Sequence, residues 1–262
     1  MVSEGTCESH IRGLLRICRF RSGPGVLQGL YKFVFETPRG SGSGVMFATP
    51  DGRLYGGNSG SSLIGSYTEK DGVYASELTM SRHNHDPNYV AHYPVDNIVM
   101  NFTGALRGDE LHSEGHAPAL PGAVLRAIMT PINDADAPPP GKVGPDGISN
   151  GLYSIHIKML DGIDGGTTGV MLLQDGNIRG GDAFFDYIGA YSSANGRWKG
   201  EIVNREHTLT RGERPLFGGY EVGIGFSGTY DGEDAEGEAT ALAGKRSIRF
   251  KAVLRKLVSI ED

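Results

Sequence analysis

Histidines are concentrated in one part of this 262-residue chain, where they could bind a metal ion. Five of the eight lie between residues 83 and 116. His83 and His85 are two residues apart, so on a β-strand their imidazoles would share a face, close to the carboxylate of Asp86. Asn and Pro residues surround the pair, however, and they favour a polar loop. We therefore expect solvated loop histidines and no bound metal.

Two short motifs resemble enzyme signatures without the context that those signatures need. Residues 223–228 match G-x-G-x-x-G, which binds a dinucleotide only between a strand and a helix, whereas here we expect a strand to follow at Thr229. Ser59 lies in a Gly-Asn-Ser-Gly run similar to a serine-hydrolase turn, but residues 181–184, its counterpart in an internal repeat, contain no nucleophile. We expect no cofactor and no enzymatic activity.

Acidic side chains could contact a protein partner instead. The densest acidic stretch contains Asp231, Glu233, Asp234, Glu236 and Glu238. Its spacing does not match the Asp-x-Asp-x-Asp-Gly loop of an EF-hand calcium site. We interpret it as a surface loop that is solvated or faces a partner.

Asp182 follows the glycine pair Gly180-Gly181, and two roles are open for it. Glycines permit a positive φ, a bulge or a sharp bend where a barrel strand turns, and the carboxylate could then accept hydrogen bonds from freed backbone N–H groups. The other role is recognition of a partner. The candidate partner-binding residues are thus Asp182, Asp231, Glu233, Asp234 and Glu236.

Composition and charge narrow the kind of partner. The net charge of −6 provides no basic field for a phosphate backbone, so we expect no direct nucleic-acid binding. The two cysteines, Cys7 and Cys18, offer no disulfide framework and suit a reducing cytoplasm. Charged residues interrupt the apolar stretch of the first 28 positions, and no segment approaches the ~18 apolar residues of a membrane span. These features predict a cytoplasmic protein that binds no membrane.

The chain contains a long internal repeat. Three matched pairs of segments are Gly29-Leu30-Tyr31 with Gly151-Leu152-Tyr153, residues 51–58 with 175–182, and Glu114-Gly115 with Glu236-Gly237. Their separations are 122, 124 and 122 residues, and drifts of this size are typical of small insertions in surface loops. The chain is therefore a tandem duplication of one glycine-rich module.

A proline-rich segment separates the two copies. Its three consecutive prolines, residues 138–140, cannot join a sheet ladder, so it predicts an extended linker or a surface strap. Residues 8–20 have apolar side chains at helical spacing and predict a short helix, either a loose terminal extension or a partner-docking element. We divide the chain into an N-terminal extension, a first module, a linker and a second module, at residues 1–26, 27–132, 133–148 and 149–262.

Within each copy, apolar residues alternate with the period of β-strands. Asp51-Gly52 and Asp175-Gly176 are strong hairpin signals. We expect about eight strands per copy, and those of the second copy should begin near Gly151, Thr168, Asn177, Phe185, Arg197, Tyr220, Thr229 and Lys245. The predicted fold is all-β, with two tandem antiparallel up-and-down barrels of a lipocalin-like kind; a flattened sandwich is the alternative.

Four segments of the second copy carry a family resemblance. They are Gly151-Leu152-Tyr153-Ser154, Gly169-Val170, the run Gly176-Asn177-Ile178-Arg179-Gly180-Gly181-Asp182, and Tyr187-Ile188-Gly189-Ala190-Tyr191. In this order they resemble the opening half of the type III secretion negative-regulator (GrlR) family. The first copy is more divergent, with Asn58 at the position of Asp182.

The resemblance implies a small barrel that acts by binding a protein, in the best-known case by sequestering a transcriptional activator of secretion genes. Barrels of the family pair into dimers, so a fused duplication could form a pseudo-dimer within one chain. The family's acidic loop follows the fourth segment, but here residues 192–196 and 68–72 hold no such acidic run. The resemblance therefore bears on the fold more than on the identity of the partner.

We expect a non-enzymatic regulatory protein that binds and sequesters a protein partner, such as a transcriptional activator. The alternative is a barrel that carries a small apolar ligand. A lumen filled by Phe, Tyr and Leu side chains would favour the first, and an apolar cavity of ~300 Å³ or more would favour the second.

Overall fold

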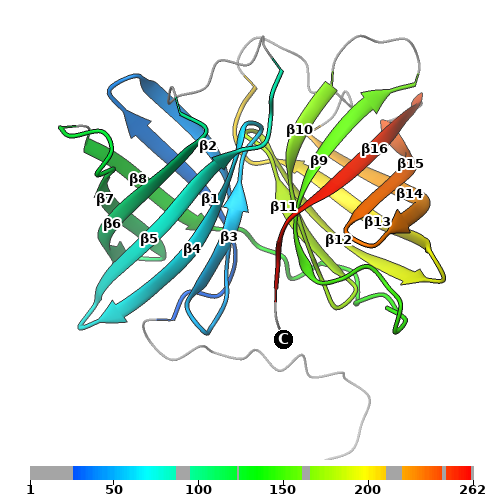
Figure 1. The fold of residues 1–262 in the computed structure, drawn as a ribbon, viewed down its shortest axis with the longest axis horizontal. Coiled ribbons are helices and arrows are strands. Elements are labelled where there is room, and N and C mark those ends of the chain that lie inside the picture. The colour runs from blue at the N-terminus through cyan, green and yellow to red at the C-terminus, as the bar shows by residue number, and fades with distance from the viewer. Residues whose placement is uncertain are drawn as a thin grey trace, which may run out of the picture.

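The computed structural model describes residues 26–86, 95–122, 124–160, 166–210, 220–243 and 246–260. Within these ranges the chain forms sixteen β-strands in two closed barrels that lie side by side (Figure 1). The described ranges hold no helix long and apolar enough to span a membrane. The helix expected over residues 8–20 lies outside them.

Each barrel is an antiparallel meander closed by pairing between its first and last strands. The first comprises β1 (Gly29–Thr37), β2 (Gly40–Ala48), β3 (Arg53–Gly57), β4 (Ser61–Lys70), β5 (Val73–Arg82), β6 (Asn97–Arg107), β7 (Glu110–His116) and β8 (Val124–Pro131). The second comprises β9 (Gly151–Met159), β10 (Gly166–Gln174), β11 (Asn177–Gly181), β12 (Phe185–Ala194), β13 (Arg197–Glu206), β14 (Glu221–Asp231), β15 (Asp234–Ala243) and β16 (Arg246–Ser259). The predicted all-β fold of two tandem barrels is confirmed, and the sandwich alternative is excluded.

The predicted hairpin turns differ between the copies. Asp175 and Gly176, with φ of 49° and 80°, form a two-residue turn between β10 and β11, because both central residues adopt the left-handed conformation of a type I′ turn. In the first copy the loop is longer, and Gly52 N donates to the Thr49 carbonyl at 3.0 Å. The Asp-Gly signal therefore predicted the position of the turn but not its length.

Strand pairing corrects the alignment of the two copies near their ends. Arg107 pairs with Glu110 across one hairpin and Asp231 pairs with Asp234 across the other, so Glu110 corresponds to Asp234. Glu114 then matches Glu238, not Glu236. The strand expected to begin at Thr229 was also misplaced, since Thr229 lies inside β14 and β15 begins at Asp234. Acidic residues form the β14–β15 turn themselves. Outward-facing polar residues alternate along the strands on both sides, so the sequence pattern did not reveal the turn.

The lumens of the barrels hold separate hydrophobic cores. The larger core fills the second barrel and includes Tyr153, Tyr191, Trp198 and Leu254, all of them buried. Ile148 of the linker joins it at one end. The core of the first barrel includes Phe33, Met46, Tyr67 and Tyr74. Inward and outward residues alternate along each strand, as expected of a small barrel.

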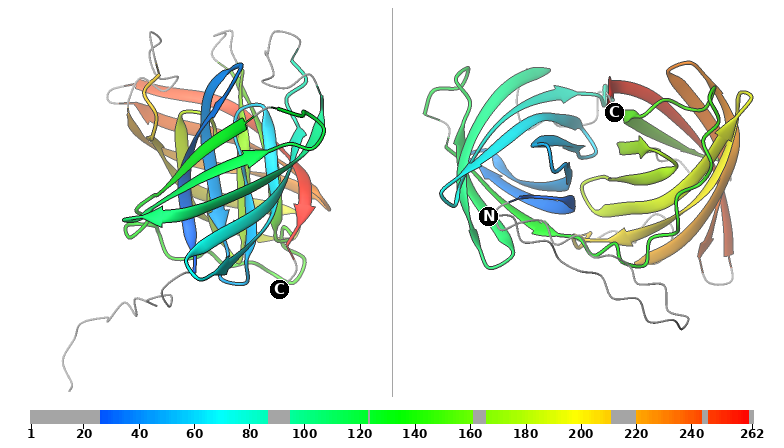
Figure 2. Two further views of the ribbon diagram at one scale, coloured as in Figure 1. Left: turned by 90° about the vertical axis from the view of Figure 1, so that its left-hand side faces the viewer. Right: turned by 90° about the horizontal axis from the view of Figure 1, so that it is seen from below.

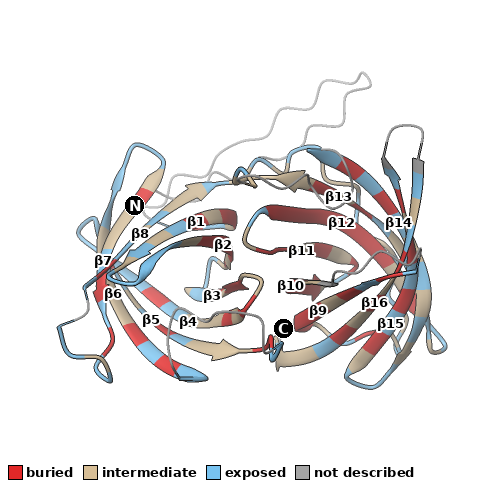
Figure 3. Cartoon of the chain, turned by 90° about the horizontal axis from the view of Figure 1, so that it is seen from above, coloured by how far each residue is buried: buried red, intermediate tan, exposed pale blue. Residues whose placement is uncertain are grey.

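A third core joins the two barrels. The outward faces of β2 and β3 pack against those of β11 and β10, and buried residues gather where β10 to β12 face the first barrel (Figure 3). Val45 lies against Gly181, and its counterpart Val170 lies against Gly57. This reciprocal contact is the pattern of a two-fold interface, in which the same patch is used by both halves. The chain is therefore a pseudo-dimer in its internal geometry.

The linker runs as a strap along the second barrel (Figure 2, right). Gly141 N donates to the Gly176 carbonyl at 3.1 Å, and Ser193 N donates to the Lys142 carbonyl at 3.0 Å. Val143 forms an isolated parallel bridge with Ser193. The prolines stay outside the sheet ladders, but the residues after them bind the β10–β11 turn and the end of β12.

Candidate functional site

The acidic stretch lies on the β14–β15 hairpin and along the outer face of β15. Its carboxylates form ion pairs with lysine and arginine side chains of β16: Asp234 with Arg255 at 2.5 Å, Glu236 with Lys251 at 2.7 Å, Glu238 with Arg249 at 2.9 Å, and Glu233 with Lys256 at 4.0 Å. Among the described residues, Asp231 has no such partner. The stretch is a cross-strand ion-pair ladder, so most of its charge is neutralised locally.

Asp182 occupies the interior of the protein. Its Oδ1 accepts hydrogen bonds from the backbone N–H groups of Phe184 at 2.7 Å and Phe185 at 2.9 Å, and its Oδ2 accepts one from the Tyr187 hydroxyl. Burial raises the pKa of the Asp182 carboxyl and, more strongly, the pKa of Tyr187. The expected turn-stabilising role is confirmed. The other expectation is corrected, because a side chain only 6% exposed cannot meet an external partner.

Asn58 repeats this arrangement in the first copy. Its Oδ1 accepts hydrogen bonds from Gly60 N at 2.9 Å and Ser61 N at 3.0 Å. The equivalent histidines then contact the two carbonyls: His83 Nε2 lies 3.0 Å from Asn58 O, and His207 Nε2 lies 3.3 Å from Asp182 O. The two β-turns are therefore built alike.

The expectation of solvated loop histidines is wrong for His83. Its side chain is buried at the junction of the barrels, where its ring lies edge-on to that of His156 at 6.2 Å between centroids. Burial lowers the pKa of both His83 and His207 to about 4, so both rings are neutral at pH 7. The described residues bring no three His, Cys, Asp or Glu side chains into a metal-binding group.

Hydrogen bonds between the barrels close the end of the junction at which His83 lies. Ser43 Oγ donates to the Ala183 carbonyl at 2.5 Å, and its counterpart Thr168 Oγ1 donates to the Ser59 carbonyl. Ala183 N donates to Ser59 Oγ at 3.2 Å, and Asn84 Nδ2 donates to Thr168 Oγ1 at 3.1 Å. Ser59, which resembled a nucleophile in the sequence, is thus an interface residue.

The other end of the junction is open and forms a cleft of about 1240 Å³. Its lining comes from the outward faces of β2, β3 and β4 on one side, from β10 and β11 on the other, and from the end of β16. The first-barrel wall combines charged with apolar and aromatic side chains: Asp51, Arg53, Phe47, Tyr55 and Ile64. The second-barrel wall presents the amides of Gln174 and Asn177.

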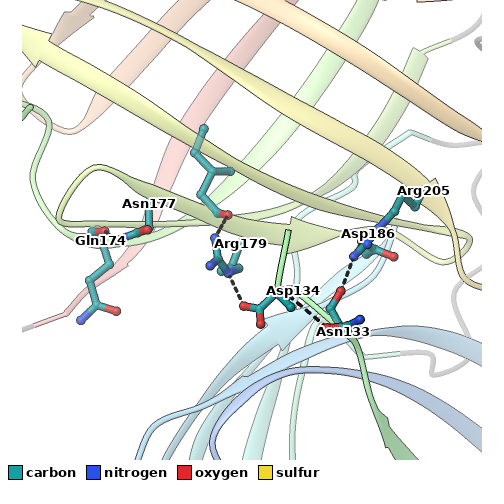
Figure 4. Close-up of polar contacts among 9 residues, drawn as sticks. Asn133, Asp134, Gln174, Asn177, Arg179, Asp186 and Arg205 are labelled. Atoms are coloured by element: carbon teal, nitrogen blue, oxygen red, sulfur yellow. Dashed lines mark hydrogen bonds and ion pairs between the residues drawn. The ribbon is translucent and has the colours of Figure 1, made fainter. Parts of the chain in front are cut away.

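A clasp holds the linker against the second barrel beside this cleft (Figure 4). Arg179 Nε donates to Asp134 Oδ2 at 3.0 Å. Arg205 Nη2 donates both to the Asn133 carbonyl and to Asp186 Oδ2, each at 3.0 Å. Asp186 is buried, so its carboxylate fixes the guanidinium in place. The clasp and the shared core hold the cleft open in one geometry.

The lumens offer much less room. The apolar cavity of the first barrel measures about 100 Å³ and that of the second about 30 Å³. Both are well below the ~300 Å³ expected of a site for a drug-sized ligand. By volume, the cleft between the barrels is the main candidate binding site.

The cleft was not predicted, but the sequence contains a signal for the interface beside it. Residues 45–48 and 170–173 are continuous apolar runs of four residues, whereas the other strands contain apolar runs of three at most. Such runs are typical of strands that are buried on both faces. The signal indicates that β2 and β10 are covered outside as well as inside, but it does not identify what covers them.

Comparisons with known proteins found no matching family model and no matching curated protein. Among solved structures, the chain is similar to a putative outer membrane protein from Bacteroides fragilis. The match has 11% sequence identity and a TM-score of 0.25, and covers 88% of this chain and 97% of that one. The resemblance to the GrlR family stays a prediction from sequence motifs.

Proposed function

We propose that this protein is a non-enzymatic binding protein that holds a segment of a protein partner in the cleft between its barrels. The observation that carries the proposal is the contrast in volume between the cleft, about 1240 Å³, and the lumens, about 100 and 30 Å³. Small-molecule sites span ~300–1,000 Å³, so the cleft exceeds that range and the lumens lie below it.

The lining of the cleft suits an extended peptide. Phe47 and Tyr55 can bury apolar side chains of the partner, because aromatic residues supply large contact areas at low entropic cost. On the facing wall, the Gln174 amide can donate to and accept from backbone amide groups, and Asn177 can accept through Oδ1, because its Nδ2 donates to the Gln174 carbonyl at 3.2 Å. The clasp at Asp134 holds the site in place before binding, which reduces the cost of association.

The resemblance to the GrlR family supports sequestration as the outcome of binding, with a transcriptional activator as the kind of partner. The ion-pair ladder argues that contact does not centre on the acidic stretch, since a partner there would have to displace Arg255 and Lys251. We therefore move the proposed contact from that stretch to the cleft.

Photo-crosslinking tests this placement. Tyr55 is replaced by p-benzoylphenylalanine, which keeps an aromatic ring in the cleft wall, and the variant is irradiated in lysate of the native cell. The matched control carries the same residue in place of Val99, an exposed position of β6 on the far side of the first barrel. Crosslinked peptides are identified by mass spectrometry.

We expect one protein to crosslink from position 55 and not from position 99, and the crosslink to fall at least tenfold when Gln174 and Asn177 are both changed to Ala. Crosslinks from both positions alike would indicate nonspecific capture. A crosslink that requires Asp231 and Glu233 but tolerates the Gln174 and Asn177 changes would return the contact to the acidic hairpin. Either result would overturn the proposal.

A further inference from the structure

The two lumens differ, although the barrels share one fold. In the second barrel, Trp198 and Phe226 pack at 4.5 Å between ring centroids, and Phe250 fills the space beside them. The first barrel has Tyr74 at the position of Trp198 and Leu125 at the position of Phe250. Both substitutions reduce the volume of the side chain that points into the lumen, and this leaves the larger cavity of about 100 Å³.

Methionine is concentrated in the lining of this cavity. Of the seven methionines in the chain, four line the first lumen: Met46, Met80, Met100 and Met129. At three of these positions the second barrel has a shorter or more rigid residue: Asn204, Ile224 and Leu254. Methionine has three rotatable bonds and a polarisable sulfur, so a wall of methionines can reshape around different apolar molecules.

The cavity is closed at one end by the chain itself. Leu27 is buried there and is held by Tyr67, whose hydroxyl donates to the Leu27 carbonyl at 2.9 Å and accepts from Leu27 N at 3.0 Å. Arg82 and Val95 lie in the lining toward the other end. Among the described lining residues, the polar groups include the hydroxyls of Ser76 and Ser113, and Arg82 is the charged one, ion-paired with Asp96 at 3.8 Å. Away from Arg82 the lining is mostly apolar, and such an interior disfavours charged molecules.

We propose that the lumen of the first barrel binds a small uncharged apolar molecule, of the size of benzene or indole, at a site separate from the cleft. Enclosed apolar cavities of ~150 Å³ stay dry and bind benzene in other proteins. Here the flexible methionines supply the extra space that a ring of this size needs. The second lumen, at about 30 Å³, has no room for one.

Methionine-methyl NMR on the full chain tests this site, with indole as the probe. Labelling with ¹³C at the methyl carbon gives a separate signal for each methionine. We expect saturable shifts for Met46, Met80, Met100 and Met129, while Met159 and Met171 of the second barrel stay within the linewidth. An absence of shifts, or equal shifts in both barrels, would overturn the proposal.

The second barrel supplies the variant that should close the site. Tyr74→Trp combined with Leu125→Phe places the second barrel's own residues into the first lumen, and we expect indole affinity to fall at least tenfold. Val124→Leu is the matched control, because residue 124 is adjacent on β8 but 54% exposed on the outer face. Unchanged indole affinity in a folded double variant would overturn the proposal. If the double variant fails to fold, Ala127→Leu fills the same lumen with a smaller change and is judged by the same criterion.

Discussion

Asp182 and Asn58 occupy equivalent positions and stabilise equivalent turns. Each places a side-chain oxygen against two backbone N–H groups, which would otherwise be buried without a partner. Asp182 also accepts a hydrogen bond from Tyr187, where the first copy has Leu63. Of the two roles that the sequence left open for Asp182, the structural one is therefore observed, and its burial follows from the neighbouring barrel.

Replacing Asp182 should separate the two functions of its carboxylate. Asp182→Ala leaves two N–H groups and a buried hydroxyl unsatisfied, so we expect a loss of about 3 kcal/mol or more in the free energy of unfolding. Asp182→Asn keeps the oxygen that binds the backbone, as Asn58 does, and should cost about 1 kcal/mol. Urea denaturation followed by tryptophan fluorescence measures both. Equal losses in the two variants would contradict this account.

The buried histidines predict acid sensitivity. The folded-state pKa of His83 and of His207 is lowered to about 4 by burial, below the ordinary value of 6.5. Between these values the unfolded chain binds protons that the folded chain does not, so the free energy of unfolding should fall as pH drops from about 6.5 to about 4. His83→Gln with His207→Gln should flatten this slope. A slope unchanged in the double variant, measured by urea denaturation across that pH range, would assign it to other groups such as His156.

Glycines determine how closely the strands of the two barrels approach. A Cβ on Gly181 would lie 2.7 Å from Val45 Cγ1 and 2.4 Å from the Phe185 carbonyl, and one on Gly57 would lie 2.9 Å from Val170 Cγ1. The Gly-Gly pairs were expected to permit a positive φ, a bulge or a sharp bend. Gly57 has such a φ, at 156°, but Gly181 does not. The property shared by the two copies is the absence of a side chain where the barrels touch.

Gly181→Ala should therefore destabilise the protein by about 2 kcal/mol, because the methyl group cannot be accommodated without shifting a strand. Gly225→Ala on β14 is the matched control, since a Cβ there meets nothing within 4 Å. We expect the control to keep its melting temperature within a degree or two, or to gain slightly because alanine has the lower entropy cost. Thermal unfolding monitored by circular dichroism compares the two. A melting temperature of Gly181→Ala equal to that of the control would refute the close-contact role.

The described part of the molecule is two closed barrels joined by a shared core and a polar network, with a clasp that fixes the linker to the second barrel. Closure gives every strand two neighbours, so the strands of each barrel complete their ladders of backbone hydrogen bonds without the other barrel. The interface therefore determines how the two barrels are oriented relative to each other, and it does not determine their secondary structure. Its polar network closes one end of the junction, and the other end forms the cleft.

Val170→Asp should separate the barrels without melting them. Val170 is fully buried and packs on the first barrel, so an unpaired carboxylate there opposes association. We expect a larger radius of gyration by small-angle X-ray scattering with the β-sheet circular dichroism retained. Ile224→Asp is the contrast, because residue 224 points into the second lumen and its substitution should reduce the β-sheet signal instead. Loss of that signal in Val170→Asp would show that the barrels fold only as a pair.

Part of the candidate site could be predicted from the sequence and part could not. The Asp175-Gly176 turn and the alternation along Tyr153, Ile155 and Ile157 predicted the hairpins and the inward faces, because these depend on neighbours close in sequence. The pairing of Asp234 with Arg255 was missed, since it depends on the register of β15 and β16, and the start of β15 was misplaced.

By itself the sequence determined the duplication and the strand content of each copy, and favoured barrels over a sandwich, because repeats and two-residue periodicity are local properties. Only the tertiary structure decided which outward-facing residues are covered. Val45, Asp182 and His83 lie buried, whereas Phe47 and Gln174 line an open cleft. The physical reason is that an outward position has the same period whether it meets water or another barrel, so its environment depends on how the two copies dock.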